Sequence, residues 1–234
     1  MKAILKKELR SYFLSPIGYV FMGVYIFLSA FFFINGSVAY GSANVKALFS
    51  NVNVMFLFLI SMLTMKSFSE EKNKKTEQLL LTAPVKLWEI VLGKYFAALC
   101  VFLITLAVSL VMPAVLFIFG DPPIGECIGG YIGFILLWAS LIAVGVFISA
   151  LTESQVISAI YTFAVLLILN YFGLIATKIS NGVISKIFSS LAVFDRFNDF
   201  SAGLLNITNI VFYLSFIFVF LFLTVKVIER KRYA

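Results

Sequence analysis

The sequence predicts an all-α integral membrane protein with six transmembrane helices, and three observations lead to that fold class. Of the 234 residues, 62% are apolar and only 12% are charged, whereas a soluble domain carries about 25% charged residues. Six long stretches contain no charged side chain, and the Lys and Arg residues gather in particular connections between them. We therefore expect residues 1–234 to form a single transmembrane domain.

The uncharged stretches locate the predicted spans. A charged side chain at mid-membrane costs at least about 2.5 kcal/mol, so each span should lie between charges. Every stretch is long enough to cross about 30 Å of hydrocarbon at about 1.5 Å per residue. The six stretches are residues 11–45, 47–65, 95–120, 127–152, 154–177 and 200–225.

The cations indicate the orientation of these spans. Of the 18 Lys and Arg residues, 14 lie in the two termini and in the connection between the second and third spans, and four lie on the other side. Cytoplasmic connections carry the excess of Lys and Arg in membrane proteins, so the first side should be cytoplasmic. An even number of spans then places both termini in the cytoplasm.

Composition excludes several classes of function. The net charge of +7 could indicate a nucleic-acid partner, but the cations flank apolar spans, so we expect contact with membrane lipid and no nucleic acid. The chain has no histidine, which excludes His-based catalysis. Cys100 and Cys127 should lie near opposite ends of the third and fourth spans, which argues against a disulfide, and no metal-ligand spacing is present.

The motifs of an intramembrane or nucleotide-hydrolysing site are also missing from the sequence. No Gly-rich phosphate loop ending in Gly-Lys-Ser or Gly-Lys-Thr occurs, and Gly129, Gly130 and Gly133 are interpreted as packing residues. None of the 11 carboxylates falls in the middle of a predicted span, which argues against a proton relay or an aspartyl protease. Weak polar groups inside the spans either bond to helices or line a cavity; the cavity candidates are Ser61, Ser158, Thr162 and Asn170.

The first 15 residues predict an interfacial amphipathic helix that ends before Pro16. Apolar side chains recur at the spacing of one helical face, while cations occupy the other face, near anionic head groups. The alternative is an ordinary positively charged flank of the first span. The apolar face comprises Leu5, Leu9, Tyr12 and Phe13, and the cationic face comprises Lys6, Lys7 and Arg10.

Three connections carry recognisable patterns. Residues 69–94 should contain two short cytoplasmic helices, the second capped by Thr82 with Pro84 in its first turn. Residues 152–155 should form a tight cytoplasmic hairpin between the fourth and fifth spans. Residues 178–208 mix phenylalanines with charges, which suits short external helices.

Three sequence blocks resemble a known family. The loop SEEKNKKTEQLLLTAPVKLWEIVLGKY, residues 69–95, is similar to the first cytoplasmic loop of type-2 ABC transporter permeases, the drug and polysaccharide exporter-like superfamily. It looks most like the gliding-motility-associated branch, which typically also has blocks like KELRSYFLSPIGYV, here residues 7–20, and VFISALTESQVISAI, here residues 146–160. The end of the chain, residues 197–229, is similar as well. One departure is Lys75, where many members have glycine.

The resemblance implies a bacterial plasma-membrane permease, an exporter, that dimerises with itself or a sister permease. It also implies a separate ATP-binding-cassette ATPase subunit that holds ATP and Mg, so that this chain needs no cofactor and is not by itself an enzyme. The residues expected to contact that ATPase are Glu70, Glu71, Glu77, Pro84, Trp88, Glu89, Lys94, Thr152, Glu153 and Gln155. The alternatives are a membrane-embedded lipid-modifying enzyme, which would have to use Asp195, Arg196 and Asp199, and an assembly scaffold.

Overall fold

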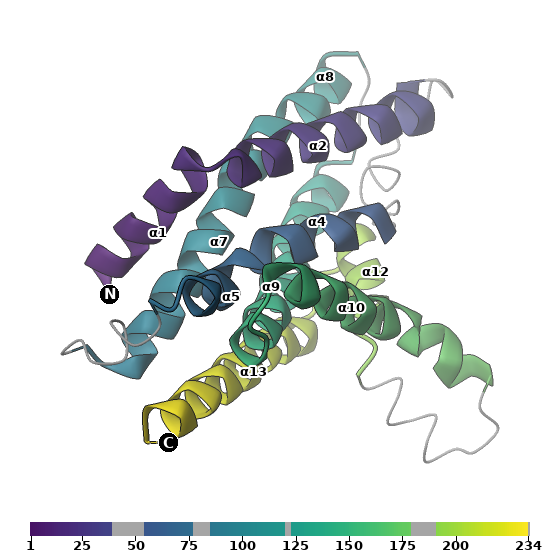
Figure 1. Ribbon diagram of the computed structural model, residues 1–234. Helices are drawn as coiled ribbons and strands as arrows, with labels where there is room; N and C mark the ends of the chain where they lie inside the picture. The colour runs from purple at the N-terminus through teal and green to yellow at the C-terminus, as the bar shows by residue number, and fades with distance from the viewer. Residues whose placement is uncertain (39–53, 77–84, 120–122, 179–190, 234) are drawn as a thin grey trace.

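In the computed structural model, the described residues are 1–38, 54–76, 85–119, 123–178 and 191–233, and all of their regular structure is helical. Figure 1 shows these helices arranged as an elongated bundle. They are α1 Lys2–Leu14, α2 Pro16–Phe33, the π-helix η1 Ile34–Val38, α4 Val54–Thr64, α5 Lys66–Asn73, α7 Leu87–Ser109, α8 Val111–Phe119, α9 Ile124–Leu151, α10 Gln155–Lys178, α12 Asp195–Ser201 and α13 Ile207–Tyr233.

Five helical stretches are long and apolar enough to cross a membrane, which confirms a multi-pass membrane protein. The predicted second span corresponds to the apolar helix at residues 55–64, which is shorter, and residues 47–53 of that span lie outside the described part of the chain. The count of six therefore stays a prediction. The five stretches are Pro16–Gly36, Leu87–Ile118, Ile124–Leu151, Gln155–Ala176 and Ile207–Arg232.

Helix boundaries differ from the uncharged stretches in two places. The third span begins at Leu87 and not near residue 95, and Val85 and Lys86 before it are not helical, so the helix expected from Thr82 does not reach them. The last helix begins at Ile207 and not near residue 200. The first difference has a physical cause: Lys94 lies inside α7 but is paired with carboxylates, so its charge does not mark the end of a helix.

The N-terminal boundary and the fourth connection agree with the sequence analysis. Helix α1 ends at Leu14, Ser15 has an extended backbone, and Pro16 occupies the first turn of α2, where its missing N–H costs nothing. Helix α9 ends at Leu151 and α10 begins at Gln155, so the predicted tight hairpin is present.

Helix α9 is the centre of the bundle. Of its most apolar window, 78% is buried, compared with at most 39% for the other long helices. Its Trp138 stacks on Phe102 of α7 with ring centroids 4.5 Å apart, and it meets Tyr25 of α2 and Phe56 of α4 edge to face. Aromatic pairs in these geometries stabilise packing beyond the area that they bury, so this cluster ties four helices together.

Small residues let neighbouring helices approach α9 closely. A methyl group added to Gly133 would collide with the side chain of Phe200 in α12, and one added to Gly145 would collide with Thr64 in α4. Gly129 similarly faces the backbone of Phe200. The interpretation of Gly129 and Gly133 as packing residues is thus confirmed, as expected for helices that associate in a membrane.

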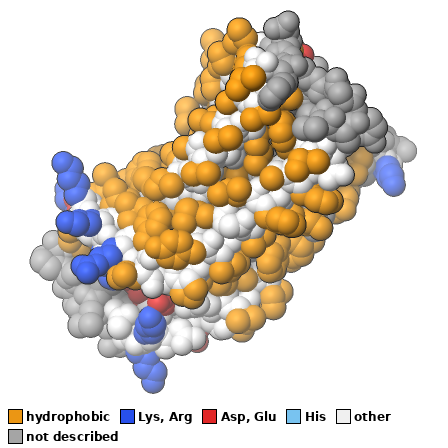
Figure 2. Space-filling model, turned by 90° about the horizontal axis from the view of Figure 1, so that it is seen from above, with side chains coloured by type: hydrophobic (Ala, Val, Ile, Leu, Met, Phe, Trp, Pro, Cys, Tyr) orange, Lys and Arg blue, Asp and Glu red, His pale blue; other side chains and the backbone are white. Residues whose placement is uncertain are grey.

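The two chain ends lie at the same end of the bundle (Figure 1). The amino group of Met1 lies 2.7 Å from Glu89 at the start of α7, and Lys231 near the other terminus donates to the carbonyl of Ala150 in the last turn of α9. Figure 2 shows most of the Lys and Arg side chains in view at one end of the molecule, the rest at the opposite end, and apolar side chains over the middle. We call the end that carries both termini the basal end.

Candidate functional site

Lys94 is the centre of a buried charge cluster at the basal end. It lies two turns into α7, only 2% exposed. Its ammonium lies 2.9 Å from Glu8 Oε1 of α1 and 3.0 Å from Glu71 Oε2 of α5, and it donates to the carbonyl of Ser67, also in α5, at 2.6 Å. The contact with Glu71 is an ion pair without hydrogen-bond geometry. One cation therefore joins three helices that are far apart in the sequence.

A second lysine fixes the C-terminal end of α1. The ammonium of Lys66, at the start of α5, donates to the carbonyl of Ser11 at 2.9 Å and to the hydroxyl of Ser15 at 3.0 Å. The Tyr12 hydroxyl donates to the carbonyl of Leu63 in α4 at 2.9 Å, and burial raises the pKa of Tyr12. Helix α1 is thus attached to the junction between α4 and α5.

Exposed ion pairs surround this buried centre. Lys7 lies 3.0 Å from Glu71, and Lys74 lies 2.6 Å from Glu70. Partial burial alone would lower the pKa of Lys7, but its hydrogen bond to Glu71 and the charges of three nearby carboxylates outweigh it and raise that pKa. Exposed pairs of this kind contribute about 0 to 1 kcal/mol each, so the buried cluster matters more to the structure.

Hydroxyl groups connect α5 to the end of α9. The Ser149 hydroxyl accepts from the backbone N–H groups of Phe68 and Ser69, at 3.0 and 3.1 Å, in the first turn of α5. The first N–H groups of a helix have no carbonyl partner one turn earlier, so Ser149 caps α5 from another helix. The Ser69 and Thr152 hydroxyls lie 3.1 Å apart, and Lys72 donates to the carbonyls of Ala150 and Thr152.

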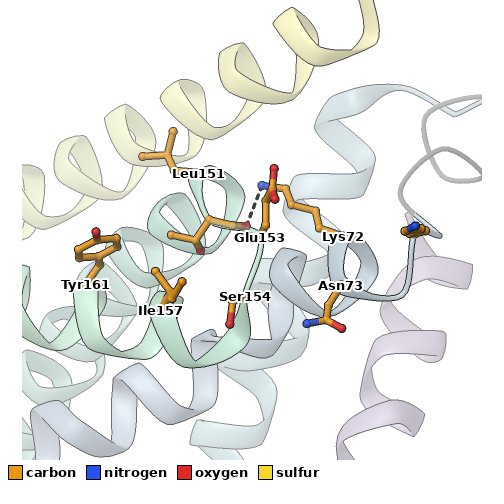
Figure 3. Close-up of a pocket in the computed structure, with 9 residues that line it drawn as sticks. Lys72, Asn73, Leu151, Glu153, Ser154, Ile157 and Tyr161 are labelled. Atoms are coloured by element: carbon orange, nitrogen blue, oxygen red, sulfur yellow. Dashed lines mark hydrogen bonds between the residues drawn. The ribbon is translucent and has the colours of Figure 1, made fainter.

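An open groove lies where the end of α5 meets the hairpin between α9 and α10 (Figure 3). Its volume is about 630 Å³, and Lys72, Asn73, Glu153 and Ser154 give it a polar rim. Tyr161 of α10 lines its apolar side. The groove combines a segment of the loop at residues 69–94 with the hairpin at residues 152–155, two connections that are about 80 residues apart in the chain.

A family model described as ABC-2 family transporter protein matches residues 3–232, nearly the whole chain. The chain belongs to this family. No curated protein matches it. Membership agrees with the resemblance to type-2 permeases, and it implies in general that this ABC-2 chain has an ATPase partner.

The predicted contact residues of the loop have partners inside this ABC-2 chain. Lys94 and Glu71 belong to the buried cluster, and Glu70 lies between Lys66 and Lys74. Glu89 pairs with the amino terminus. Trp88 stacks on Phe218 of α13 at 6.2 Å between centroids and lies tilted against Phe222 at 6.3 Å. The ammonium of Lys94 is enclosed, so its place is in the internal cluster and not on an outer surface.

The hairpin residues divide between interior and surface. Thr152 is 8% exposed and bonded to α5, Glu153 is exposed, and Gln155 is partly buried at the start of α10. Glu77 and Pro84 lie outside the described residues. Glu153 is therefore the predicted contact residue most available to another protein.

The N-terminal helix presents its cations outward, as expected, since Lys6, Lys7 and Arg10 are exposed. Part of its apolar side packs on protein. Tyr12 is buried against α4, and Ile4 meets Gly93 of α7 so closely that a methyl group on that glycine would collide with it.

The predicted cavity residues are placed inside the bundle. Ser61 is fully buried and donates to the carbonyl of Leu57 in its own helix. Ser158 and Thr162 lie one turn apart on α10, fully buried, and in the described part of the chain their hydroxyls have no hydrogen-bond partner. Asn170 is partly buried. A buried hydroxyl without a hydrogen-bond partner costs free energy. A polar path beside Ser158 and Thr162 would supply the missing partners, so these two residues are better candidates for lining it than Ser61, whose hydroxyl is already bonded.

Charged residues in the segment that was predicted to be external have structural partners. Arg196 donates to the side chain of Asn209 at 3.1 Å, and Asn209 donates to Asp199 at 2.8 Å. This chain of hydrogen bonds joins α12 to α13. It favours a structural role for these charges over the active site of a lipid-modifying enzyme.

Sequence reasoning missed the partners of Lys94, above all Glu8. A signal was present, because Glu8 is the single acidic residue before Glu70 in a segment rich in lysine. A lone carboxylate on an otherwise cationic helix is well placed to meet a buried cation. Ser69 and Ser149 were missed too, and no spacing within the sequence connects them.

Proposed function

We propose that this chain is the permease subunit of an ATP-binding-cassette exporter, driven by a separate ATPase subunit at its basal end. The observation that carries the proposal is the groove that residues 72–75 form with the hairpin, within a chain of the ABC-2 family. Parts of two of the blocks that resemble the gliding-motility-associated branch, residues 69–95 and 146–160, line this groove. The basal end would then face the cytoplasm of a bacterial cell.

The internal contacts support transmission of movement from this surface to the spans. Helix α5 is bonded to α9 through Ser149 and to α7 through Lys94. Helices and buried ion pairs are stiff, so a displacement of α5 would be passed to two long helices at once. A short helix that is attached to several spans is a suitable lever for ATP-driven closure.

The exposed apolar faces support a membrane setting with a second permease subunit. Phe27 of α2, Ile160 of α10 and Phe218 of α13 are each 59% to 66% exposed. Surfaces of this kind lie against lipid or against another subunit. Dimerisation remains part of the proposal, with the partner either a second copy or a sister permease.

The experiment is co-purification of the tagged full chain with the soluble ATPase encoded beside it. The test variant is Glu153→Lys, which reverses an exposed charge on the groove without breaking an ion pair among the described residues. The control is Asp195→Lys, which makes the same change of charge at an exposed position of α12. We expect Glu153→Lys to weaken binding of the ATPase roughly fivefold or more, and Asp195→Lys to leave it unchanged.

Two results would count against the proposal in different ways. If the unmodified chain never binds an ATPase, the proposed function is wrong. If it binds one and Glu153→Lys has no effect on binding or on ATP hydrolysis, the function stands but the groove is not the contact surface.

A further inference from the structure

We propose that the groove between α1 and α5 binds the phosphate head group of an anionic phospholipid. This second groove has a volume of about 670 Å³, and its lining comes from α1, Ser15 and α5 with its C-cap Lys74. Five cations and one carboxylate line it, so its walls carry an excess of positive charge. These residues are Lys6, Lys7, Arg10, Lys66, Lys74 and Glu70.

Two of these cations are available to a ligand. Lys66 is enclosed and bonded to α1, Lys7 pairs with Glu71, and Lys74 pairs with Glu70. Lys6 and Arg10 are exposed and form no ion pair within the part of the chain that the structure describes. They are four residues apart, which places them on the same face of α1. Two unpaired cations one turn apart can hold one phosphate between them.

The apolar end of the groove favours a phospholipid over other ligands that contain phosphate. Leu14, one turn beyond Arg10, lines the groove and is 75% exposed. The chain then turns at Ser15 into α2, whose Tyr19 and Val20 are also exposed. A head group at the cations would leave its acyl chains beside Leu14, at the junction of α1 and α2. An acidic protein or a free phosphate ion would use the cations but not the apolar end.

The position of the groove fits the proposal physically. Basic residues beside a membrane entry point attract anionic lipid, each with an attraction worth roughly a fivefold change in affinity. A bound head group would hold α1 against α5 from outside, opposite the buried Lys94. This inference needs a membrane setting but not the ATPase partner, so it stands or fails independently of the proposed function.

The test measures the thermal unfolding midpoint of the purified full chain in detergent during titration with lipid. The probes are dioleoyl phosphatidylglycerol, dioleoyl phosphatidylcholine with the same acyl chains, and inorganic phosphate. Binding to the folded state raises the midpoint. We expect phosphatidylglycerol to raise it in a saturable way, and the other two probes to leave it nearly unchanged.

The test variant is the double substitution Lys6→Gln and Arg10→Gln, and the matched control is Arg230→Gln and Arg232→Gln. All four side chains are exposed and at the basal end, and exposed substitutions leave the fold intact. The test variant should lose roughly thirtyfold in affinity for phosphatidylglycerol, whereas the control should change less than about twofold. Lys6→Arg alone keeps the charge and should retain binding.

Each other outcome would overturn the proposal. An equal effect of inorganic phosphate would show a site for free phosphate. An equal loss in test variant and control would show general charge attraction. Unchanged lipid binding in the test variant would show that Lys6 and Arg10 do not form the site.

Discussion

Replacing Lys94 with methionine tests whether the buried cluster holds the basal end together. The substitution keeps a long, flexible side chain but removes the charge that α1, α5 and α7 share. Glu8 and Glu71 would remain with 9% and 12% of their side chains exposed. Two carboxylates would then be left near each other with little solvent and without their common cation.

The size of the effect follows from that geometry. Removing one partner of a buried ion pair costs about 3 to 5 kcal/mol, because the other charge stays buried and uncompensated. For a chain of this length, a loss of 1 kcal/mol lowers the unfolding midpoint by about 2 to 4 °C. Lys94→Met should therefore lower the midpoint by roughly 6 to 20 °C.

The assay is thermal unfolding of the purified chain in detergent, with two comparison variants. Lys86→Met changes an exposed lysine just before α7 and should alter stability by no more than about 0.5 kcal/mol. Adding Glu8→Gln and Glu71→Gln to Lys94→Met removes both carboxylates that lose Lys94, of which Glu71 keeps only the exposed Lys7 as a partner, and should restore most of the loss. The reasoning would be refuted if Lys94→Met were as stable as Lys86→Met, or if the triple variant were no better than the single one.

Three further predictions concern backbone geometry, packing and topology. Lys75→Gly should raise the free energy of unfolding by about 1 kcal/mol in chemical denaturation. Lys75 has φ 56°, a left-handed conformation that glycine adopts at lower cost than lysine. A loss of stability would contradict this. Gly145→Ala should lower the free energy of unfolding by about 1 to 3 kcal/mol, because the added methyl group would collide with Thr64. Gly23→Ala should not lower it, because a methyl group there meets open space. Equal effects of the two substitutions in unfolding assays would contradict this prediction. For the topology, each test chain lacks the native cysteines and carries one new cysteine. A chain with Lys74→Cys should react with an impermeant thiol reagent only from the cytoplasmic side, and a chain with Asn206→Cys should react only from the outside. The reverse labelling would overturn the orientation.

The sequence was sufficient for much of the fold because uncharged length and helix breakers act locally. Pro16 and the polar hairpin at residues 152–154 end helices wherever they occur, and the structure has both breaks. The resemblance also raised a local question at Lys75, where many type-2 permeases have glycine. In the structure, Lys75 has a left-handed backbone conformation just after α5. The N–H of Thr76 donates to the carbonyl of Glu71 at 2.8 Å. This helix ending favours glycine at the position of Lys75.

The start of α7 and the charge cluster could not be predicted from the sequence in the same way. The rule that a charge ends a span assumes that the charge is unpaired, and Lys94 violates it through two carboxylates, 86 and 23 residues earlier. Likewise, Trp88 was expected to contact the ATPase subunit, and the sequence did not indicate that its ring partners lie on α13, near the other end of the chain. Such pairings depend on tertiary structure, which local patterns do not contain.

Cross-linking from single cysteines to the ATPase subunit tests the central claim most directly. The chain with Glu153→Cys at the groove, and without its native cysteines, should cross-link to the ATPase subunit in an amount that changes with ATP. The chain with Asn206→Cys, an exposed position before α13, should not. Cross-linking from Asn206 but not from Glu153, or from neither position in a complex that still transports, would contradict the account.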